Sequence, residues 1–204
     1  PIVWNTSGYE AVETLRMLDG LVDIYLTDCK YFSRELAARC SKAPDYFDRC
    51  MSAIAEMLRQ TGSPQFRDRD GETLTAVQYN ERVAETPLTD SPEQDDYAGP
   101  LMTRGTIVRH LLLPGEIADS KRIVDALLTA FGADIYLSLM NQYTPTPQVR
   151  DIPPLNRKIP ADAYDEVIDY ALTRGLENGF LQGEGTDEAS FIPTFDGRGL
   201  EASP

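Results

Sequence analysis

The side chains in this sequence best suited to chemistry are charged and short polar residues that follow apolar segments. Asp28 and Lys30 lie two positions apart at the end of the stretch VDIYLTDCKY, residues 22–31. Strand side chains alternate between faces, so both point the same way as Val22. Opposite charges on a buried face are costly unless they pair or a ligand uses them. The stretch therefore predicts a structural ion pair or, as we favour from position, a site for a zwitterionic or charged ligand.

A second candidate is the turn Asn5-Thr6-Ser7-Gly8, which leads from an apolar segment into an expected helix. Ser7 and Glu10 have the S-x-x-E spacing of a capping box, which gives the turn a purely structural explanation. Alternatively, backbone N–H groups and short side chains at the helix N-terminus hold an anionic or hydroxyl-bearing ligand. The spacing alone does not separate the two hypotheses.

Later apolar segments carry four more polar candidates. Arg109 and His110 are adjacent in TIVRHLLLPG (106–115), so they occupy opposite faces of a strand. Gln142 and Tyr143 end DIYLSLMNQY (134–143). His110 is the single histidine, which excludes His-rich metal sites, and no G-x-S-x-G turn supports a Ser–His–Asp triad. A lone histidine in a strand is more often a hydrogen-bonded structural residue than a ligand.

The cysteines and the net charge exclude several kinds of partner. The spacings of Cys29, Cys40 and Cys50 match no zinc or iron–sulfur pattern, and we expect them to serve packing. Their odd number, without a signal peptide, indicates a reducing compartment, and we expect a cytoplasmic location. A net charge of −14 argues against nucleic acid and anionic membrane surfaces, which need a basic patch. No apolar run approaches the roughly 20 residues of a membrane helix.

Strands alternating with helices must position these residues. We expect strands at 1–5, 22–31, 106–115 and 134–143, and helices at 8–19, 33–40, 45–60, 119–131 and 161–174. Continuous apolar runs indicate a parallel α/β sheet covered by helices. Right-handed crossovers bring the carboxyl ends of parallel strands to one rim, where such sheets and barrels hold their chemistry.

The remaining segments differ in composition. Residues 63–104 show little periodicity, and we expect a surface insertion that is partly disordered around 84–100. We assign residues 1–182 to one domain and 183–204 to an acidic C-terminal tail, with 190–196 as a docking segment. Because the sequence opens inside a strand, we expect it to be cut from a longer protein. The exposed edge of strand 1–5 is then expected to dimerise or to recruit another segment.

Five segments occur together in the order and wording of one known family: PIVWNTSGYE, VDIYLTDCKY, IVRHLLLPG, YLSLMNQY and GLENGF. The chain resembles the C-terminal portion of radical S-adenosylmethionine proteins related to the pyruvate formate-lyase activating enzymes. The resemblance covers nearly all of residues 1–62 and 103–196. It implies a partial (β/α)6 TIM-like barrel, of which this chain supplies the last four strand–helix units.

The resemblance also implies an activity. Such an enzyme reduces S-adenosylmethionine with a 4Fe-4S cluster, and the 5′-deoxyadenosyl radical takes a hydrogen from a glycine of a glycyl radical enzyme. An electron donor such as flavodoxin or ferredoxin is implied as well. The cluster motif C-x-x-x-C-x-x-C and the glycine-rich segment that follows the family's second strand are absent from this sequence. We therefore expect this chain alone to hold no cluster and to be inactive.

The resemblance implies cofactor-binding roles for nine residues. Asp28 and Lys30 match a pair near the methionyl carboxylate and amine, and Arg109 matches an arginine near the cofactor. Gln142 and Tyr143 stand near a position where related enzymes carry a histidine. The full set is Asn5, Thr6, Ser7, Asp28, Lys30, Arg109, His110, Gln142 and Tyr143.

Two alternatives stay open. One is a radical S-adenosylmethionine enzyme that acts on another protein or a small molecule, because a fold does not fix its substrate. The other is a non-enzymatic binding module that keeps the barrel half without a cluster. A cluster motif encoded within about a hundred residues upstream of Pro1 separates the enzymes from the module.

Overall fold

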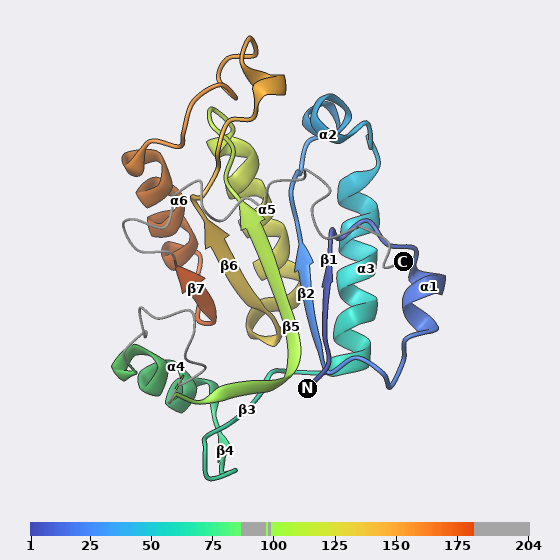
Figure 1. Ribbon diagram of the computed structural model, residues 1–204, viewed down its shortest axis with the longest axis vertical. Coiled ribbons are helices and arrows are strands. Elements are labelled where there is room, and N and C mark those ends of the chain that lie inside the picture. The colour runs from blue at the N-terminus through green and yellow to red at the C-terminus, as the bar shows by residue number, and fades with distance from the viewer. Residues whose placement is uncertain (87–96, 98, 182–204) are drawn as a thin grey trace, which may run out of the picture.

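The computed structural model describes residues 1–86, 97 and 99–181. At its centre, parallel strands follow one another across the sheet in chain order (Figure 1). They are β1 (Val3–Thr6), β2 (Ile24–Asp28), β5 (Leu101–Leu111), β6 (Tyr136–Met140) and β7 (Gly179–Leu181). Each pairs in parallel with the next. The prediction of a parallel α/β sheet is confirmed, and β7 adds a strand to the four expected.

Helices cover one face of this sheet, which we call the helix-covered face. They are α1 (Val12–Arg16), α2 (Arg34–Ser41), α3 (Tyr46–Thr61), α5 (Ile117–Phe131) and α6 (Ala161–Thr173). Val108 of β5 and Leu137 of β6 are fully buried there against Ile54, Leu127 and Val167 of α3, α5 and α6. In Figure 1, α5 lies behind β5 and β6. Short 3-10 turns lie at Gly132–Asp134 and Pro147–Val149.

The alternation of strand side chains defines the second face. Tyr25 and Thr27 of β2 are fully buried on the helix-covered face, whereas Leu26 and Asp28 are half-buried on the other side. We call this other side, which also carries Ile107 and Arg109 of β5 through the strand register, the pocket face. The two faces therefore separate the packing residues of each strand from the residues available to a ligand.

The insertion contains more regular structure than expected. Its described part forms β3 (Gln65–Arg67), β4 (Thr73–Leu74) and α4 (Ala76–Glu85), and β3 pairs antiparallel with the start of β5. Phe66 stacks on Tyr79 with ring centroids 4.1 Å apart and contacts the edge of Tyr136 at 5.4 Å. With Ile24 and Met102 these rings form a second core that covers the amino end of the pocket face. Residues 63–104 are thus partly integral to the fold.

The first helix begins later than expected. The prediction of a Ser7–Glu10 capping box was wrong: α1 begins at Val12, and Ala11 caps it without a side-chain hydrogen bond. Gly8 has a left-handed φ of +81°, and the Tyr9 ring stacks on Tyr46 at 5.8 Å. These two features hold the chain out of a helix over this turn. Ser33, by contrast, caps α2 with its side chain, which accepts from the Leu36 N–H at 3.1 Å.

Strand β1 lies at the edge of the sheet. Among the described strands it pairs with β2 alone, and Ile2, Val3 and Trp4 are exposed. The edge position agrees with the sequence, and its coverage by a second copy or another segment stays a prediction. The predicted acidic tail at 183–204, including 190–196, and residues 87–96 and 98 of the insertion lie outside the described residues. No described helix combines the length and apolar character that crossing a membrane requires.

Candidate functional site

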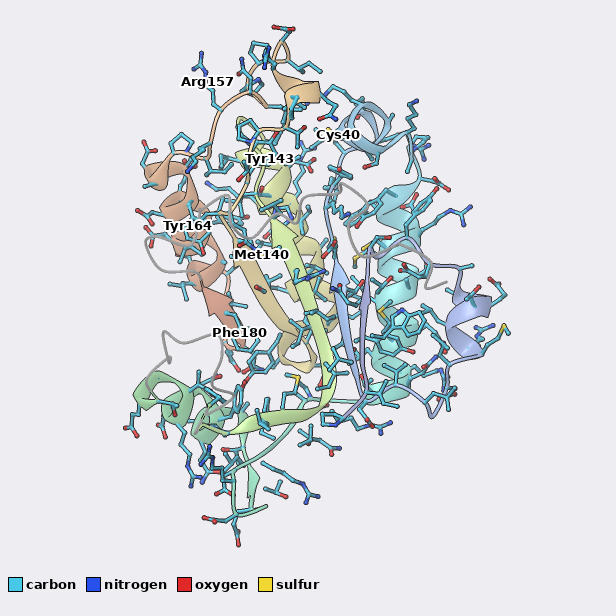
Figure 2. All side chains as sticks on the ribbon, viewed as in Figure 1. Cys40, Met140, Tyr143, Arg157, Tyr164 and Phe180 are labelled. Atoms are coloured by element: carbon cyan, nitrogen blue, oxygen red, sulfur yellow. The ribbon has the colours of Figure 1, made fainter. Side chains whose placement is uncertain are left out.

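A pocket of about 400 Å³ opens on the pocket face at the carboxyl ends of β2, β5 and β6. Figure 2 shows Met140 and Tyr143 at this end of the sheet, while Phe180 lies nearer the opposite end. Five of the predicted cofactor-binding residues meet here. The lining residues are Asp28, Lys30, Tyr31, Arg109, Leu111, Leu113, Met140, Gln142 and Tyr143.

Asp28 is the centre of the charged cluster in this pocket. Asp28 and Arg109 are direct partners in the strand register, and Oδ1 of Asp28 accepts from Nε at 2.9 Å and Nη2 at 2.7 Å of Arg109. Nζ of Lys30 lies 3.4 Å from Oδ2. The side chains of Asp28, Arg109 and Lys30 are 19%, 24% and 39% exposed, so all three remain accessible to a ligand. Two cations and one carboxylate leave a local positive excess, which suits an anionic or zwitterionic ligand.

Strand β1 contributes one residue to the cluster, close to its carboxyl end. Nη2 of Arg109 donates to Oδ1 of Asn5 at 2.7 Å, so Asn5 orients the guanidinium. The hydroxyls of Thr6 and Ser7 donate instead to the carboxylate of Glu10. Thr6 and Ser7 therefore do not line the pocket, and their predicted contact with a ligand has no support in this geometry.

His110 lies outside the pocket. It is 2% exposed on the helix-covered face, with Nδ1 2.8 Å from the Cys29 carbonyl and Nε2 2.9 Å from Oγ of Ser120. Because a carbonyl can only accept, Nδ1 carries the proton. The predicted cofactor contact of His110 therefore has no support in this geometry. Its neighbour Arg109 occupies the pocket face, and adjacent strand residues point to opposite faces.

Protonation of His110 is expected to couple stability to pH. Burial lowers the pKa of His110, so the folded state favours neutral imidazole while the unfolded chain titrates near about 6.5. The stabilisation is complete above that pH and is lost as pH falls below it, by up to about 1.4 kcal/mol per pH unit. Urea unfolding between pH 7.5 and 5 should show a steeper decline for the wild type than for His110→Gln. Parallel declines would contradict this expectation.

Gln142 and Tyr143 form the rim. Nε2 of Gln142 lies 3.6 Å from Sδ of Met140, and the Tyr143 hydroxyl donates to the Leu155 carbonyl at 2.7 Å. Burial raises the pKa of Tyr143, so its phenol stays protonated. The Tyr143 ring also borders a neighbouring cavity of about 350 Å³ that contains Cys40 of α2.

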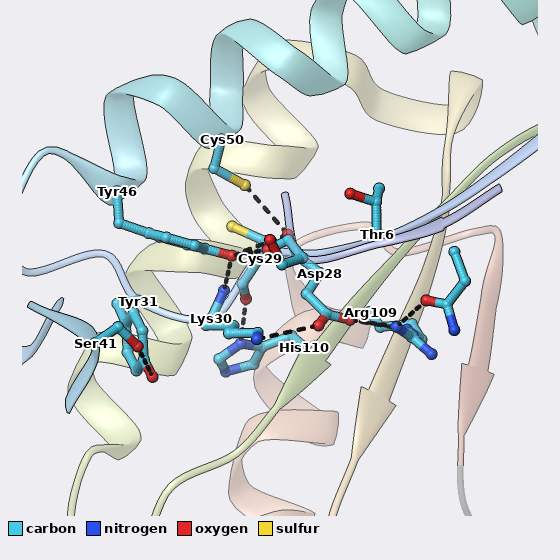
Figure 3. A network of polar contacts seen from close by, with 12 residues as sticks. Thr6, Asp28, Cys29, Lys30, Tyr31, Ser41, Tyr46, Cys50, Arg109 and His110 are labelled. Carbon is cyan, nitrogen blue, oxygen red and sulfur yellow. Dashed lines mark hydrogen bonds and ion pairs between the residues drawn. The ribbon is translucent and has the colours of Figure 1, made fainter. Parts of the chain in front are cut away.

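Two positioning residues were not identified from the sequence. The Asp119 carboxylate accepts the N–H groups of Phe32 and Ser33, both at 2.8 Å, and so holds the segment that follows Lys30. The Tyr46 hydroxyl contacts the backbone beneath the pocket (Figure 3). In the sequence, Asp119 is recognisable only as an acidic residue in the first turn of a helix, and Tyr46 only as a tyrosine on the apolar stripe of another helix. Neither signal is specific without the tertiary structure.

The described residues do not fit an iron–sulfur cluster. Cys29 and Cys50 are fully buried in the core, and Cys40 is exposed on α2. Within the described ranges, no group of three or more His, Cys, Asp or Glu side chains could hold a metal ion.

Comparison with known proteins gives one distant relative. No protein-family model matches the chain, and no solved structure is significantly similar to it. An uncharacterised protein of Methanocaldococcus jannaschii is 22% identical over 177 residues, which cover 87% of this chain and 39% of that protein. The chain therefore spans about two fifths of the length of this relative.

Proposed function

We propose that this chain is the C-terminal portion of a radical S-adenosylmethionine enzyme of the type that activates glycyl radical enzymes. The observation that carries the proposal is the charged cluster of Asp28, Lys30 and Arg109 at the carboxyl ends of adjacent parallel strands. These are the residues that match the family in the sequence. In the proposal, the pocket that they line binds S-adenosylmethionine.

The strand order supports a partial (β/α)6 barrel. A doubly wound sheet reverses its strand order and carries helices on both faces. Here the parallel strands keep the chain order, and α3, α5 and α6 pack on the same face. A barrel is built in this way, with its inner face at the pocket and its ligands at the carboxyl ends of the strands. The same order and coverage are also compatible with an open sheet of five parallel strands.

The pocket suits the chemistry of S-adenosylmethionine. Its methionyl group carries a carboxylate, which Arg109 and Lys30 would bind, and an ammonium, which Asp28 would bind. Leu111 and Met140 provide an apolar wall for the nucleoside. About 400 Å³ lies within the usual range of small-molecule sites.

The 4Fe-4S cluster, which supplies the electron for this chemistry when bound, has no ligands among the described residues. In the proposal those ligands belong to another part of a longer protein, as do the contacts to flavodoxin or ferredoxin and to a glycyl radical enzyme. The second candidate, a binding module that works without a cluster, needs no such ligands and would use the same pocket. An enzyme acting on a different protein or small molecule would share the same pocket.

Anaerobic production of 5′-deoxyadenosine tests the proposal. The full-length gene product, reconstituted with iron and sulfide and supplied with S-adenosylmethionine and dithionite, should form 5′-deoxyadenosine, and this chain alone should not. A gene without an upstream C-x-x-x-C-x-x-C motif, or a reconstituted protein without the product, would favour the binding module.

A further inference from the structure

The hydroxyl of Tyr46 joins two segments beneath the pocket (Figure 3). Tyr46 is the first residue of α3 and is 3% exposed. Its hydroxyl lies 2.7 Å from the Ser7 carbonyl and 3.1 Å from the Asp28 carbonyl, and it accepts from the Lys30 N–H at 3.2 Å. A phenol carries one proton and can also accept, so a single group serves both backbone segments.

The position of this hydroxyl is fixed by its surroundings. The Tyr46 ring meets the edge of Tyr31 at 5.3 Å and stacks on Tyr9 at 5.8 Å. One helical turn later, Sγ of Cys50 donates to the same Asp28 carbonyl at 3.3 Å. The backbone at Asp28 is therefore held from the helix-covered face by two side chains of α3.

The side chains of Asp28 and Lys30 leave this backbone on the pocket face, where they meet Arg109. We propose that Tyr46 is a positioning residue for the ligand pocket: it fixes the backbone at Asp28 and Lys30 from behind without contacting the ligand. This inference rests on the proposed function of the pocket. Its physical basis is that charged recognition requires placement within about half an ångström, which depends on the groups that support the binding residues.

Substitution Tyr46→Phe keeps the ring and removes the hydroxyl. The matched control is Tyr25→Phe, because Tyr25 is fully buried in the same strand as Asp28 and its hydroxyl donates to Gln60 at 2.7 Å, away from the pocket. Both variants lose buried hydrogen bonding of a phenol, one bond in Tyr25→Phe and at least two in Tyr46→Phe, and we expect the urea midpoint to fall in both. Affinity for S-adenosylmethionine, measured by calorimetric titration, should fall about tenfold for Tyr46→Phe, as expected when the hydrogen bond to the Lys30 N–H behind the site is lost. For Tyr25→Phe it should stay within about twofold.

Amide hydrogen exchange tests the anchoring without any ligand. The Lys30 amide should be protected in the wild type and in Tyr25→Phe, and it should exchange faster in Tyr46→Phe. Rapid exchange at Lys30 in the wild type would overturn the inference even if Tyr46→Phe fails to fold. So would wild-type affinity in a folded Tyr46→Phe variant.

The two readouts separate this inference from the proposed function. A wild type that does not bind S-adenosylmethionine, with faster Lys30 exchange in Tyr46→Phe alone, would remove the proposed ligand and keep the anchoring role of Tyr46. Normal binding by the wild type with no effect of Tyr46→Phe on affinity would remove the positioning role and keep the ligand.

Discussion

Gly8→Ala is expected to destabilise the fold by about 2–5 kcal/mol, the sum of a left-handed backbone penalty and an overpacking cost. Gly8 has φ of +81°, and a Cβ added there would lie 2.0 Å from the Asp28 carbonyl oxygen. It would also lie 3.1 Å from Sγ of Cys50 and from the Tyr46 hydroxyl. Backbone, thiol and phenol form one packed unit beneath the pocket, so relief of the clash must move the backbone at Asp28.

Gly20→Ala is the matched control for this change. Gly20 has φ of +82°, and nothing lies within 4 Å of a Cβ built there. Alanine at this position should cost only the backbone penalty of about 1–2 kcal/mol. Urea unfolding gives the loss in the free energy of unfolding for each variant. The difference between the two losses is the cost of the contact with Asp28. Equal losses in the two variants would show that the turn after β1 does not pack on β2 as described.

The parallel sheet and the position of the charged pair Asp28 and Lys30 could both be predicted from the sequence. Apolar runs separated by helical segments indicated the parallel sheet, and strand alternation placed Asp28 and Lys30 on one face at its carboxyl end. Strand alternation depends only on the order of residues along the chain, so it can be recognised without a structure. The sequence also predicted that Arg109 and His110 occupy opposite faces of their strand. Which of the two faces the pocket depends on the helices that cover the sheet, and the alternation does not reveal it.

The features that the sequence did not reveal depend on contacts between distant segments. Residues 65–85 look irregular because their aromatic residues are few and widely spaced. Phe66 and Tyr79 become a core only when β3 pairs with β5 and Tyr136 lies beneath them. The capping pattern at Ser7 was misleading because packing of Gly8 against β2 outweighs a local preference worth about 1 kcal/mol.

Asp28→Asn is expected to have the largest effect on ligand binding. The substitution keeps the size of the side chain, removes the acceptor charge between Arg109 and Lys30, and leaves the ligand ammonium without an anionic partner. Hydrogen bonds to charged groups are worth about 1.5–3 kcal/mol, so affinity for S-adenosylmethionine should fall at least about tenfold. Lys30→Ala should weaken binding less, because Lys30 is 39% exposed and sits at 3.4 Å from Asp28.

Asp125→Asn provides the control for loss of an aspartate–arginine pair. Asp125 bonds Arg174 at 2.6 Å between α5 and α6, away from the pocket. The substitution Asp125→Asn should leave affinity for S-adenosylmethionine within about twofold of the wild type. It removes only a partly exposed ion pair, which contributes little to stability.

Calorimetric titration of S-adenosylmethionine into the wild type, Asp28→Asn and Asp125→Asn tests the central claim most directly. The proposed site predicts saturable binding by the wild type, binding at least about tenfold weaker by Asp28→Asn, and near-wild-type binding by Asp125→Asn. Absence of binding by the wild type, or equal affinity in all three proteins, would contradict the assignment of this pocket to S-adenosylmethionine.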